Sequence, residues 1–297
     1  MLQSLAKYRF LTAEQIRKLH FPEGSQSYCN ERLRALFHKP YRYVDRRPLP
    51  LEWGKGSPKL VYTLTKRGAD RLKEEGFFKD VTFQSLYKLK QGTAEYKKHE
   101  IAVNEFMIAA EQGAKQKGWE MESWISEADF KHPSLLKELK AYDPETGRDI
   151  PVAPDGFFSL YFPEQDKRAL FFLELDRGTM EIARFRYKKI RGYTLFGEKW
   201  REIETFRKYK DLPITFRVLN VIDGGEQRMA NLLHIAAEKE FESDPDDERL
   251  AKSRRFYFSL LKDITPESVF SDPLWLVPYR SRTPEEKFAL IDFERSF

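Results

Sequence analysis

The chain has 297 residues, of which 41% are hydrophobic and 33% are charged, a balance typical of a folded globular protein and not of a disordered one. Its single cysteine, Cys29, excludes an internal disulfide framework and a zinc cluster built from cysteines. No apolar run approaches the roughly 20 residues that span a bilayer, and Lys7 and Arg9 interrupt the first apolar residues, where a signal peptide needs its apolar segment. We therefore expect a cytoplasmic protein that does not contact a membrane.

The net charge of +5 is unevenly distributed along the chain. Residues 1–75 contain 16 Lys and Arg against 8 Asp and Glu, a net charge of +8, whereas residues 76–297 contain 36 basic and 39 acidic residues, a net charge of −3. Such asymmetry is expected when one module of a protein meets a polyanion. A basic but merely solvated surface would give the same count.

The first elements are predicted to be helical. Thr12 and Gln15 have the spacing of a capping box, which predicts a helix that begins after Thr12. The stretch "PEGS" then breaks the chain, and a second helix is predicted from Ser25 or Ser27 onward. Cys29 falls in that second helix, where a small buried residue is expected.

Two strands and a further helix follow. The segments "YRYVDRR" and "KLVYTLT" predict strands joined by a Gly/Pro-rich basic tip, and a helix is predicted from Thr65 to a stop at Gly76. Helices followed by a basic hairpin and another helix follow the order of a winged helix-turn-helix, in which one helix enters the major groove and the hairpin touches the DNA backbone. The alternative is a winged-helix unit that contacts protein instead of DNA.

The basic side chains of this unit are the expected contacts to nucleic acid. On the hairpin they would meet phosphates mainly, which determine affinity but carry no sequence information. The predicted contacts are Arg32, Arg34, Lys39, Arg46, Arg47, Lys55 and Lys59.

A polar connector is predicted at about 77–93, and the pattern then changes. A long amphipathic helix begins near residue 94, and strands are predicted at "WEMESWISE", "PVAPDGFFSLYF" and "ALFFLELD". The last of these is almost wholly apolar and is therefore expected to be central in its sheet. A helix from "TMEIARFRYKKIRGYTLF", a strand from "ITFRVLNVID" and another helix complete the order, whereas 128–150 reads as a polar loop.

Three acidic residues lie in or beside the predicted strands, namely Asp155, Glu174 and Asp176. A carboxylate in a buried strand is costly unless a positive group or a metal ion lies beside it. The order helix, three strands, helix, strand resembles the core of the PD-(D/E)xK nucleases, where an Asp at the second strand and an acid on the third hold a divalent metal. Pro154-Asp155 matches the first part of that motif, and Glu174-Leu175-Asp176 takes the place of the second.

The chemistry of that site explains the residue types. Mg²⁺ prefers carboxylate and water oxygens and polarises a phosphoryl group, while a lysine stabilises the charge that develops on the phosphate. Asp176 stands where the lysine is expected, and Lys189, on the apolar face of the following helix, is the candidate for a displaced lysine. A structural ion pair with Arg177 is the alternative partner of these acids.

Three other acids are possible further ligands of the metal or of a water molecule. Glu100 and Glu105 lie on the long helix, and Glu127 follows the first strand of the second part of the chain.

Several segments together resemble the bacterial replication-relaxation family of plasmids and other mobile elements. They are "YRFLTAEQIRKLHF", "ERLRALF", "VYTLTKRGADRL", "HEIAVNEFMIAA", "PDGFF", "LELDRGTME", "KIRGY" and, near the C-terminus, "FYFSLLKDI" and "DPLWLVP". The resemblance covers roughly residues 1–280, and Asp155, Glu174, Asp176, Lys189 and Tyr193 match the pattern of the family. It implies a DNA-handling protein of a mobile element.

We therefore expect an α/β (α+β) protein with a winged helix-turn-helix at 1–76, a connector at 77–93 and a PD-(D/E)xK nuclease-like mixed-sheet domain at 94–297. The first hypothesis is an endonuclease or nickase that uses Mg²⁺ or Mn²⁺, with Asp155, Glu174 and Asp176 as metal ligands and Lys189 as the fourth catalytic group. The partner would be double-stranded DNA, with other replication or transfer proteins and a homodimer as further possibilities.

Two alternatives remain at this point. One is a non-catalytic DNA-binding accessory factor or transcriptional regulator with a degenerate nuclease fold, in which the acids form a structural network. The other is a tyrosine relaxase that uses Tyr193 covalently, against which the scattered positions of the five histidines argue, since such enzymes cluster histidines around a metal. No P-loop and no Gly-rich dinucleotide motif is present, so ATP and NAD are not implied.

Overall fold

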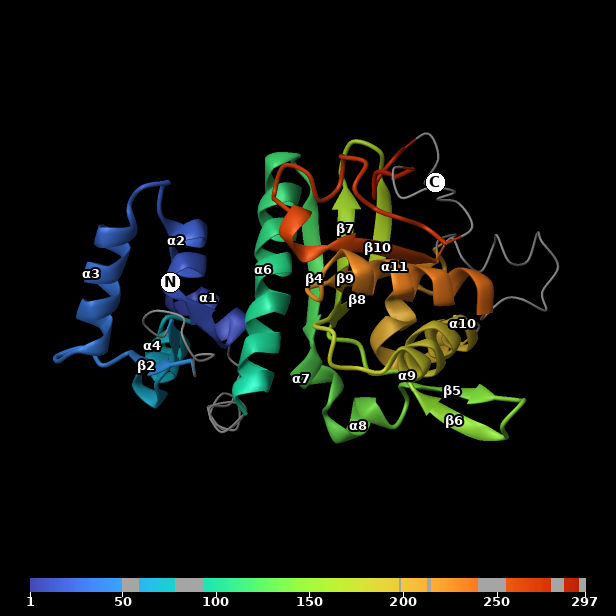
Figure 1. The fold of residues 1–297 in the computed structure, drawn as a ribbon. Coiled ribbons are helices and arrows are strands. Elements are labelled where there is room, and N and C mark those ends of the chain that lie inside the picture. The colour runs from blue at the N-terminus through green and yellow to red at the C-terminus, as the bar shows by residue number, and fades with distance from the viewer. Residues whose placement is uncertain are drawn as a thin grey trace. The chain divides into compact units, whose positions relative to one another are not determined.

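The computed structural model describes residues 1–49, 59–77, 93–197, 199–212, 215–239, 255–278 and 286–293. The chain divides into two compact units, Met1–Ile108 (unit 1) and Ala109–Phe297 (unit 2). The division falls inside the long helix α6 (Ala94–Gln116), which Figure 1 shows as one continuous helix. Most of the predicted connector, residues 78–92, lies outside the described residues.

Unit 1 combines short helices with a small antiparallel sheet. The sheet has the strand order β1-β3-β2. Its elements before α6 are α1 (Leu2–Tyr8), β1 (Leu11–Thr12), α2 (Ala13–His20), α3 (Gln26–Phe37), β2 (Val44–Pro48), β3 (Leu60–Leu64) and α4 (Lys66–Glu74). Leu5, Ile16, Leu33 and Leu64 are fully buried and form part of its core.

Local sequence signals explain where the helices of unit 1 begin. The Thr12 hydroxyl accepts a hydrogen bond from the Gln15 amide (3.2 Å), and the Gln15 side chain accepts one from the Thr12 amide (3.0 Å), so the predicted capping box is confirmed. The Thr65 hydroxyl accepts from the Gly68 amide in the same way at the start of α4. These contacts satisfy amides that a helix leaves without an internal partner.

Unit 2 is built on a five-stranded mixed sheet. The strands are β4 (Glu120–Ser126), β7 (Gly156–Phe162), β8 (Lys167–Asp176), β9 (Phe216–Ile222) and β10 (Phe256–Leu260), in the order β10-β9-β8-β7-β4. β8, β9 and β10 run parallel to one another, and β7 is antiparallel to both β8 and β4. The central position predicted for the apolar "ALFFLELD" strand, β8, is confirmed, because residues 169–176 are buried and the strand pairs on both edges.

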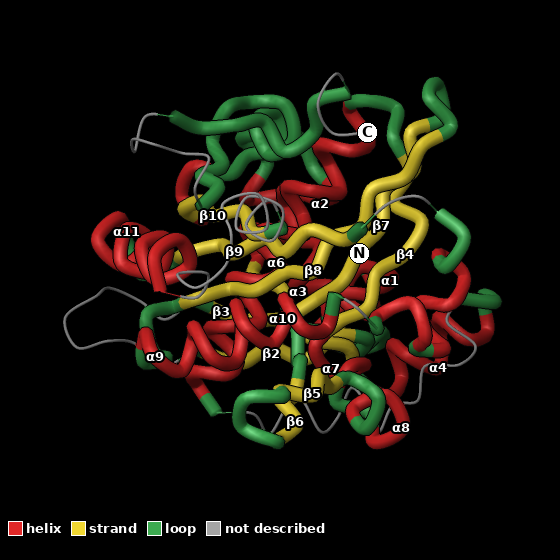
Figure 2. The backbone as a smooth tube through the Cα atoms, turned by 90° about the vertical axis from the view of Figure 1, so that its right-hand side faces the viewer, coloured by secondary structure: helices red, strands yellow, loops and turns green. Residues whose placement is uncertain are grey.

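The helix predicted after β8 is divided into three parts. α9 (Ile182–Phe185) passes into a π-helical stretch, η1 (Arg186–Arg191), and then into α10 (Gly192–Phe196). Figure 2 shows these helices along one face of the sheet, where Phe185, Ile190 and Phe196 join the core with Phe172. π-Helical turns are rare and frequently occur at functional sites.

The segment 128–150 differs from the expected loop, because it forms short regular elements. These are α7 (Glu127–Phe130), α8 (Pro133–Leu136) and the hairpin of β5 (Lys140–Asp143) and β6 (Arg148–Pro151). Ala141 and Ile150 face each other across the hairpin and are buried. The polar composition hid this pattern, since only every second residue of such a short strand is covered.

Helical turns and an extended segment complete unit 2. The helical segments are η2 (Trp200–Glu202), η3 (Glu204–Tyr209), α11 (Glu226–His234), η4 (Ile235–Lys239) and η5 (Leu261–Asp263). Trp275 and Leu276 form bridges to Phe288 and Phe258 and are buried, so the apolar C-terminal segment packs within the chain. Every helix of the described residues is too short or too polar to cross a lipid bilayer.

Candidate functional site

Two of the predicted acids meet at one end of the sheet in unit 2. In the β7–β8 register Gly156 lies opposite Leu173, so Asp155, one residue earlier, lies opposite Glu174. The Asp155 amide donates to the Leu173 carbonyl (3.0 Å), and Asp155 Oδ2 accepts from the Leu175 amide (2.7 Å). Because paired residues of neighbouring strands share a face, Asp155 and Glu174 lie on the face that packs against α9, η1 and α10.

Gly156 allows the chain to approach closely at this point. A Cβ atom added to Gly156 would lie 2.5 Å from the ring of Trp124 on β4. Any side chain at position 156 would therefore push Trp124 aside and disturb the strand pairing that places Asp155.

Glu174 has two partners on the helical layer. Lys189 Nζ lies 2.5 Å from Glu174 Oε2, and the Tyr193 hydroxyl donates to Glu174 Oε1 (2.6 Å). Lys189 Nζ also donates to the Ala153 carbonyl (2.9 Å). Glu174 is only 3% exposed, so Lys189 and Tyr193 take the place of water around a buried carboxylate.

The expected direction of Lys189 toward the sheet is confirmed. Lys189 lies in the π-helical stretch and Tyr193 four residues later in α10, and side chains four residues apart share a helix face. Both side chains consequently reach the same carboxylate.

The charged groups of this cluster change one another's pKa values. Burial raises the pKa of Glu174 to about 7; the ammonium of Lys189 offsets part of this effect, and the neighbouring Asp155 adds to it. Burial alone would lower the pKa of Lys189, but the carboxylates of Glu174 and Asp155 outweigh it and raise that pKa. Burial and the negative charge of Glu174 raise the pKa of Tyr193 well above its usual range.

The buried state of Tyr193 also bears on the covalent hypothesis. Tyr193 is 0% exposed and its hydroxyl donates to Glu174. A phenol with a raised pKa yields little phenolate at neutral pH, so this environment opposes the activation that a nucleophile needs.

Glu127 is a further acid at the same end of the sheet. Ser126 lies opposite Gly156 in the β4–β7 register, so Glu127 follows on the side of Asp155. One carboxylate oxygen of Glu127 pairs with Lys131, whereas Oε2 is buried with no hydrogen-bond partner among the described residues. The negative charge of Glu127 contributes to the raised pKa of Lys189, which places it within electrostatic reach of the cluster.

Asp176 is bound by a residue that the sequence did not single out. Arg228 on α11 donates from Nε (2.8 Å) and Nη2 (3.0 Å) to the two carboxylate oxygens, and the Gly178 amide donates to Oδ2 (3.1 Å). Arg177, the expected partner, instead lies 3.8 Å from Asp223. Arg228 is 52 residues away along the chain, and no local pattern points to it.

A divalent metal fits this cluster only with ligands from outside the chain. No group of three or more His, Cys, Asp or Glu in the described part of the protein is arranged to hold a metal ion. Mg²⁺, however, is commonly bound by one or two carboxylates together with water and substrate phosphates. Asp155 and Glu174 provide two carboxylates, and Glu127 Oε2 is a buried acceptor whose partner is missing, at a cost of about 1–3 kcal/mol.

The other two acids considered as ligands belong to unit 1. Glu105 pairs with Lys18 and accepts from the Gln15 side chain (3.1 Å), and Glu100 is buried on the same helix. Glu105 therefore has a structural role in fastening α2 to α6.

Most of the predicted DNA contacts lie on the surface of unit 1. Arg32, Arg34 and Lys39 are exposed on or just after α3, and no described residue forms an ion pair or hydrogen bond with their side chains. Three others have partners within the unit, and Lys55 lies outside the described residues. These three are Arg46 over the Phe37 ring (4.4 Å), Arg47 near Asp45 (3.7 Å) and Lys59 near Glu14 (4.0 Å).

The chain matches the model of the replication-relaxation family over residues 2–209. The protein belongs to the replication-relaxation family. No curated protein and no solved structure matches the chain. The segment shared with the replication-relaxation family includes α3 and the cluster of Asp155, Glu174, Lys189 and Tyr193, and it ends before Arg228.

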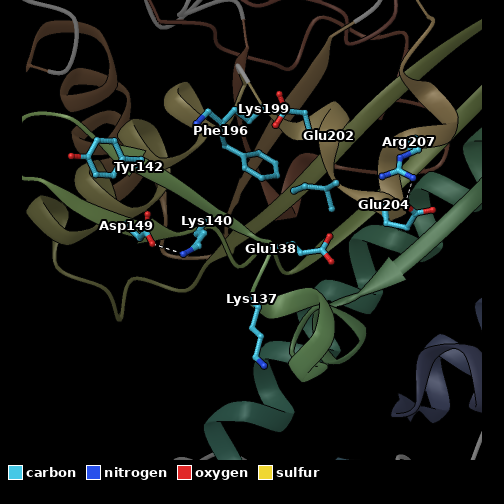
Figure 3. A pocket seen from close by; sticks show the side chains of 11 residues that line it. Lys137, Glu138, Lys140, Tyr142, Asp149, Phe196, Lys199, Glu202, Glu204 and Arg207 are labelled. Atoms are coloured by element: carbon cyan, nitrogen blue, oxygen red, sulfur yellow. Dashed lines mark hydrogen bonds and ion pairs between the residues drawn. The ribbon is translucent and has the colours of Figure 1, made fainter.

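Unit 2 also has a groove of about 500 Å³ away from the residues that the sequence indicated (Figure 3). Two ion pairs, Lys140–Asp149 and Arg207–Glu204, lie in its wall. The groove is lined by Lys137, Glu138, Lys140, Tyr142, Asp149, Phe196, Lys199, Glu202, Ile203, Glu204 and Arg207. Four basic and four acidic residues leave this lining without net charge, so it offers no general attraction for a polyanion.

Proposed function

We propose that this protein binds double-stranded DNA of a plasmid or another mobile element and acts in its replication or relaxation. Membership of the replication-relaxation family supports the role in replication or relaxation. The single observation that carries DNA binding is the set of exposed basic side chains at α3, Arg32, Arg34 and Lys39, which have no acidic partner among the described residues.

The element order of unit 1 supports a winged-helix mode of binding. α1, β1, α2, α3, β2, β3 and α4 follow one another as in that architecture, with α3 as the recognition helix and β2–β3 as the wing. Arg32 and Arg34 on α3 are proposed to enter the major groove, where arginine reads guanine or holds phosphates. Arg46, Arg47, Lys55 and Lys59 on the wing are proposed phosphate contacts.

The test is the binding of labelled duplex DNA as a function of salt. Arg32→Ala/Arg34→Ala should weaken binding and reduce the slope of log K against log salt, by about 0.9 for each phosphate that the variant no longer neutralises. Lys73→Ala is the matched control, since Lys73 is exposed on α4 with no partner among the described residues. Equal weakening in Lys73→Ala, or an unchanged slope in the double variant, would remove α3 from the interface.

A second candidate function is strand cleavage in unit 2. The observation that favours it is the convergence of Asp155, Glu174 and Lys189, which the order of a PD-(D/E)xK core predicts. We propose Asp155 and Glu174 as ligands of Mg²⁺ or Mn²⁺, with Glu127 beside them. The metal would polarise the phosphoryl group, while Lys189 would stabilise negative charge that develops on a phosphate oxygen.

Asp176 has a different part in this proposal. Arg228 binds both oxygens of Asp176 as a bidentate partner, and the proposed role of Asp176 is to fix the end of β8 and thereby the position of Glu174, instead of binding metal directly.

Supercoiled-plasmid cleavage with Mg²⁺ or Mn²⁺ tests this candidate. Metal-dependent nicking that is lost in Asp155→Ala and retained in Asp211→Ala, a control at an exposed acid, would support it. Absence of cleavage by the wild-type protein on DNA of its own element, with duplex binding intact, would leave the accessory-factor or regulator function.

A further inference from the structure

A second basic surface lies on unit 2, outside the acidic cluster. It comprises Arg184 on α9, Tyr187 and Lys188 on η1, and Arg148 on the β5–β6 hairpin, and we term it the hairpin–helix face. The Tyr187 hydroxyl lies 3.4 Å from the Thr146 hydroxyl in the hairpin turn, which joins the two elements. Both views of the fold show the hairpin beside these helices (Figures 1 and 2).

The positive charge of this face is largely unopposed. Arg148 and Arg184 are exposed and Lys188 is half-buried, and the side chains of all three are without an ion pair or hydrogen bond to the described part of the chain. The three acids of the hairpin have other partners: Asp143 and Glu145 pair with Arg191 at 2.5 Å and 2.9 Å, and Asp149 pairs with Lys140.

Those two ion pairs also fix the geometry. Asp143 is fully buried and accepts from Arg191, from the Thr146 hydroxyl (2.8 Å) and from the Glu145 amide (3.2 Å). The hairpin turn is thus fastened to the helix through Asp143, Glu145 and Thr146. The helix itself contributes a single acid between residues 177 and 197, Glu181.

The exposed aromatic ring distinguishes this face from an ordinary phosphate-binding patch. Tyr187 is 36% exposed and follows Arg184 by three residues and precedes Lys188 directly, and the contact with Thr146 holds its hydroxyl end. A tyrosine ring of this kind stacks on an unpaired base, whereas in a duplex the base faces are covered by neighbouring pairs. Proteins that bind single strands usually combine aromatic rings, which stack on the bases, with basic side chains that follow the phosphate backbone.

We propose that the hairpin–helix face binds single-stranded DNA, with Tyr187 stacked on a base and Arg148, Arg184 and Lys188 contacting phosphates. This role is additional to the duplex contacts of α3 and does not require cleavage at Asp155. It would let unit 2 hold a strand that has separated from its complement.

The experiment measures fluorescence anisotropy of the full chain with a fluorescein-labelled oligomer of about 20 deoxythymidines, longer than the ~4–16 nucleotides that one single-strand-binding fold covers. Tyr187→Leu should raise the Kd about tenfold, within the range measured for removal of one base stack. Tyr187→Phe keeps the ring and should bind as the wild type does. Arg148→Ala/Arg184→Ala/Lys188→Ala should reduce the salt slope by about 2, or roughly 0.7 for each of three phosphate contacts.

Tyr142→Leu is the matched control, because Tyr142 is 56% exposed on the same hairpin but lines the groove of Figure 3, which has no net charge. It should leave the Kd within twofold. A Kd for Tyr187→Leu within twofold of the wild-type value would overturn the proposal, as would equal weakening by Tyr142→Leu or tighter binding of a uridine RNA oligomer of the same length.

Duplex binding separates this inference from the proposed function. The hairpin–helix variants should bind duplex DNA as the wild type does, and Arg32→Ala/Arg34→Ala should lose duplex binding but keep the thymidine oligomer. Loss of both ligands in the α3 variant alone would assign the single strand to unit 1 and overturn the inference.

Discussion

Replacing Lys189 with methionine should make the stability of the protein depend on pH in a way that the wild type does not. In the wild type, burial raises the pKa of Glu174 to about 7 from an ordinary value of 4.5, and the charge of Lys189 is the largest influence that opposes burial. Methionine keeps the length and the apolar stem but removes this charge. The pKa of Glu174 in the variant should therefore rise further, above the pH range of the experiment.

The magnitude follows from proton linkage. A carboxyl group with a raised folded-state pKa contributes stability at low pH, which is lost as the pH rises from the unfolded pKa to the folded one. In the wild type that loss is complete near pH 7, where Glu174 ionises beside Lys189. In Lys189→Met the folded state keeps its proton, so stability continues to fall by about 1.4 kcal/mol for each further pH unit.

Between about pH 7 and pH 8.5 the variant should thus lose about 2 kcal/mol more than the wild type. Lys189 itself has a raised pKa and remains charged throughout this range, so removing its other interactions adds a constant that does not vary with pH. Urea unfolding monitored by tryptophan fluorescence reports on unit 2, in which Trp200 and Trp275 are fully buried.

Two variants control the interpretation. Lys199→Met changes an exposed lysine and should show no extra dependence on pH, and Lys189→Met/Glu174→Gln should lose the dependence because the titrating group is gone. A stability difference between Lys189→Met and wild type that stays constant from about pH 6 to pH 8.5 would refute the coupling of Lys189 to Glu174.

Three further outcomes are expected. Asp143→Asn should lower the Tm at neutral pH but have less effect near pH 2. The Arg191 guanidinium lowers the pKa of Asp143 to about 2, so the stability that the Asp143 carboxylate contributes is lost as the pH falls through that value. A Tm difference independent of pH would contradict this. Asp176→Asn should lower the Tm, since Arg228 keeps only part of its bidentate partner, while duplex binding by unit 1 stays unchanged. Thr12→Ala should cost about 1 kcal/mol of unfolding free energy, the usual value of an N-cap. Ser27→Ala, at an exposed position of α3, should cost much less.

Signals that act over a few residues were readable from the sequence. The capping box of Thr12 and Gln15, the helix start at Thr65 and the central apolar strand that ends at Asp176 depend on neighbours within one helix turn or one strand, and the structure confirms each of them. The direction of Lys189 was also readable, because a helix face repeats at a known period.

The sequence predicted the partners of the acids only in part. The pattern places Asp155 and Glu174 on adjacent strands, but the register that sets them opposite each other depends on the pairing of β7 with β8. Arg228, which holds Asp176, comes from α11, and the sequence contains nothing that distinguishes it from the other arginines. The same limit applies to Arg191 and the buried Asp143, whose ion pair holds the β5–β6 hairpin that the polar composition of residues 128–150 hides.

The sequence by itself therefore determined the order of elements, the basic character of unit 1 and the candidate set of acids with Lys189. Only the tertiary structure decided which charge neutralises which, and with it the raised pKa of Glu174 and the unopposed cations of the hairpin–helix face. The physical reason is that helix caps and apolar periodicity act between near neighbours in the chain, whereas ion pairs and burial depend on distances that folding alone creates between remote residues.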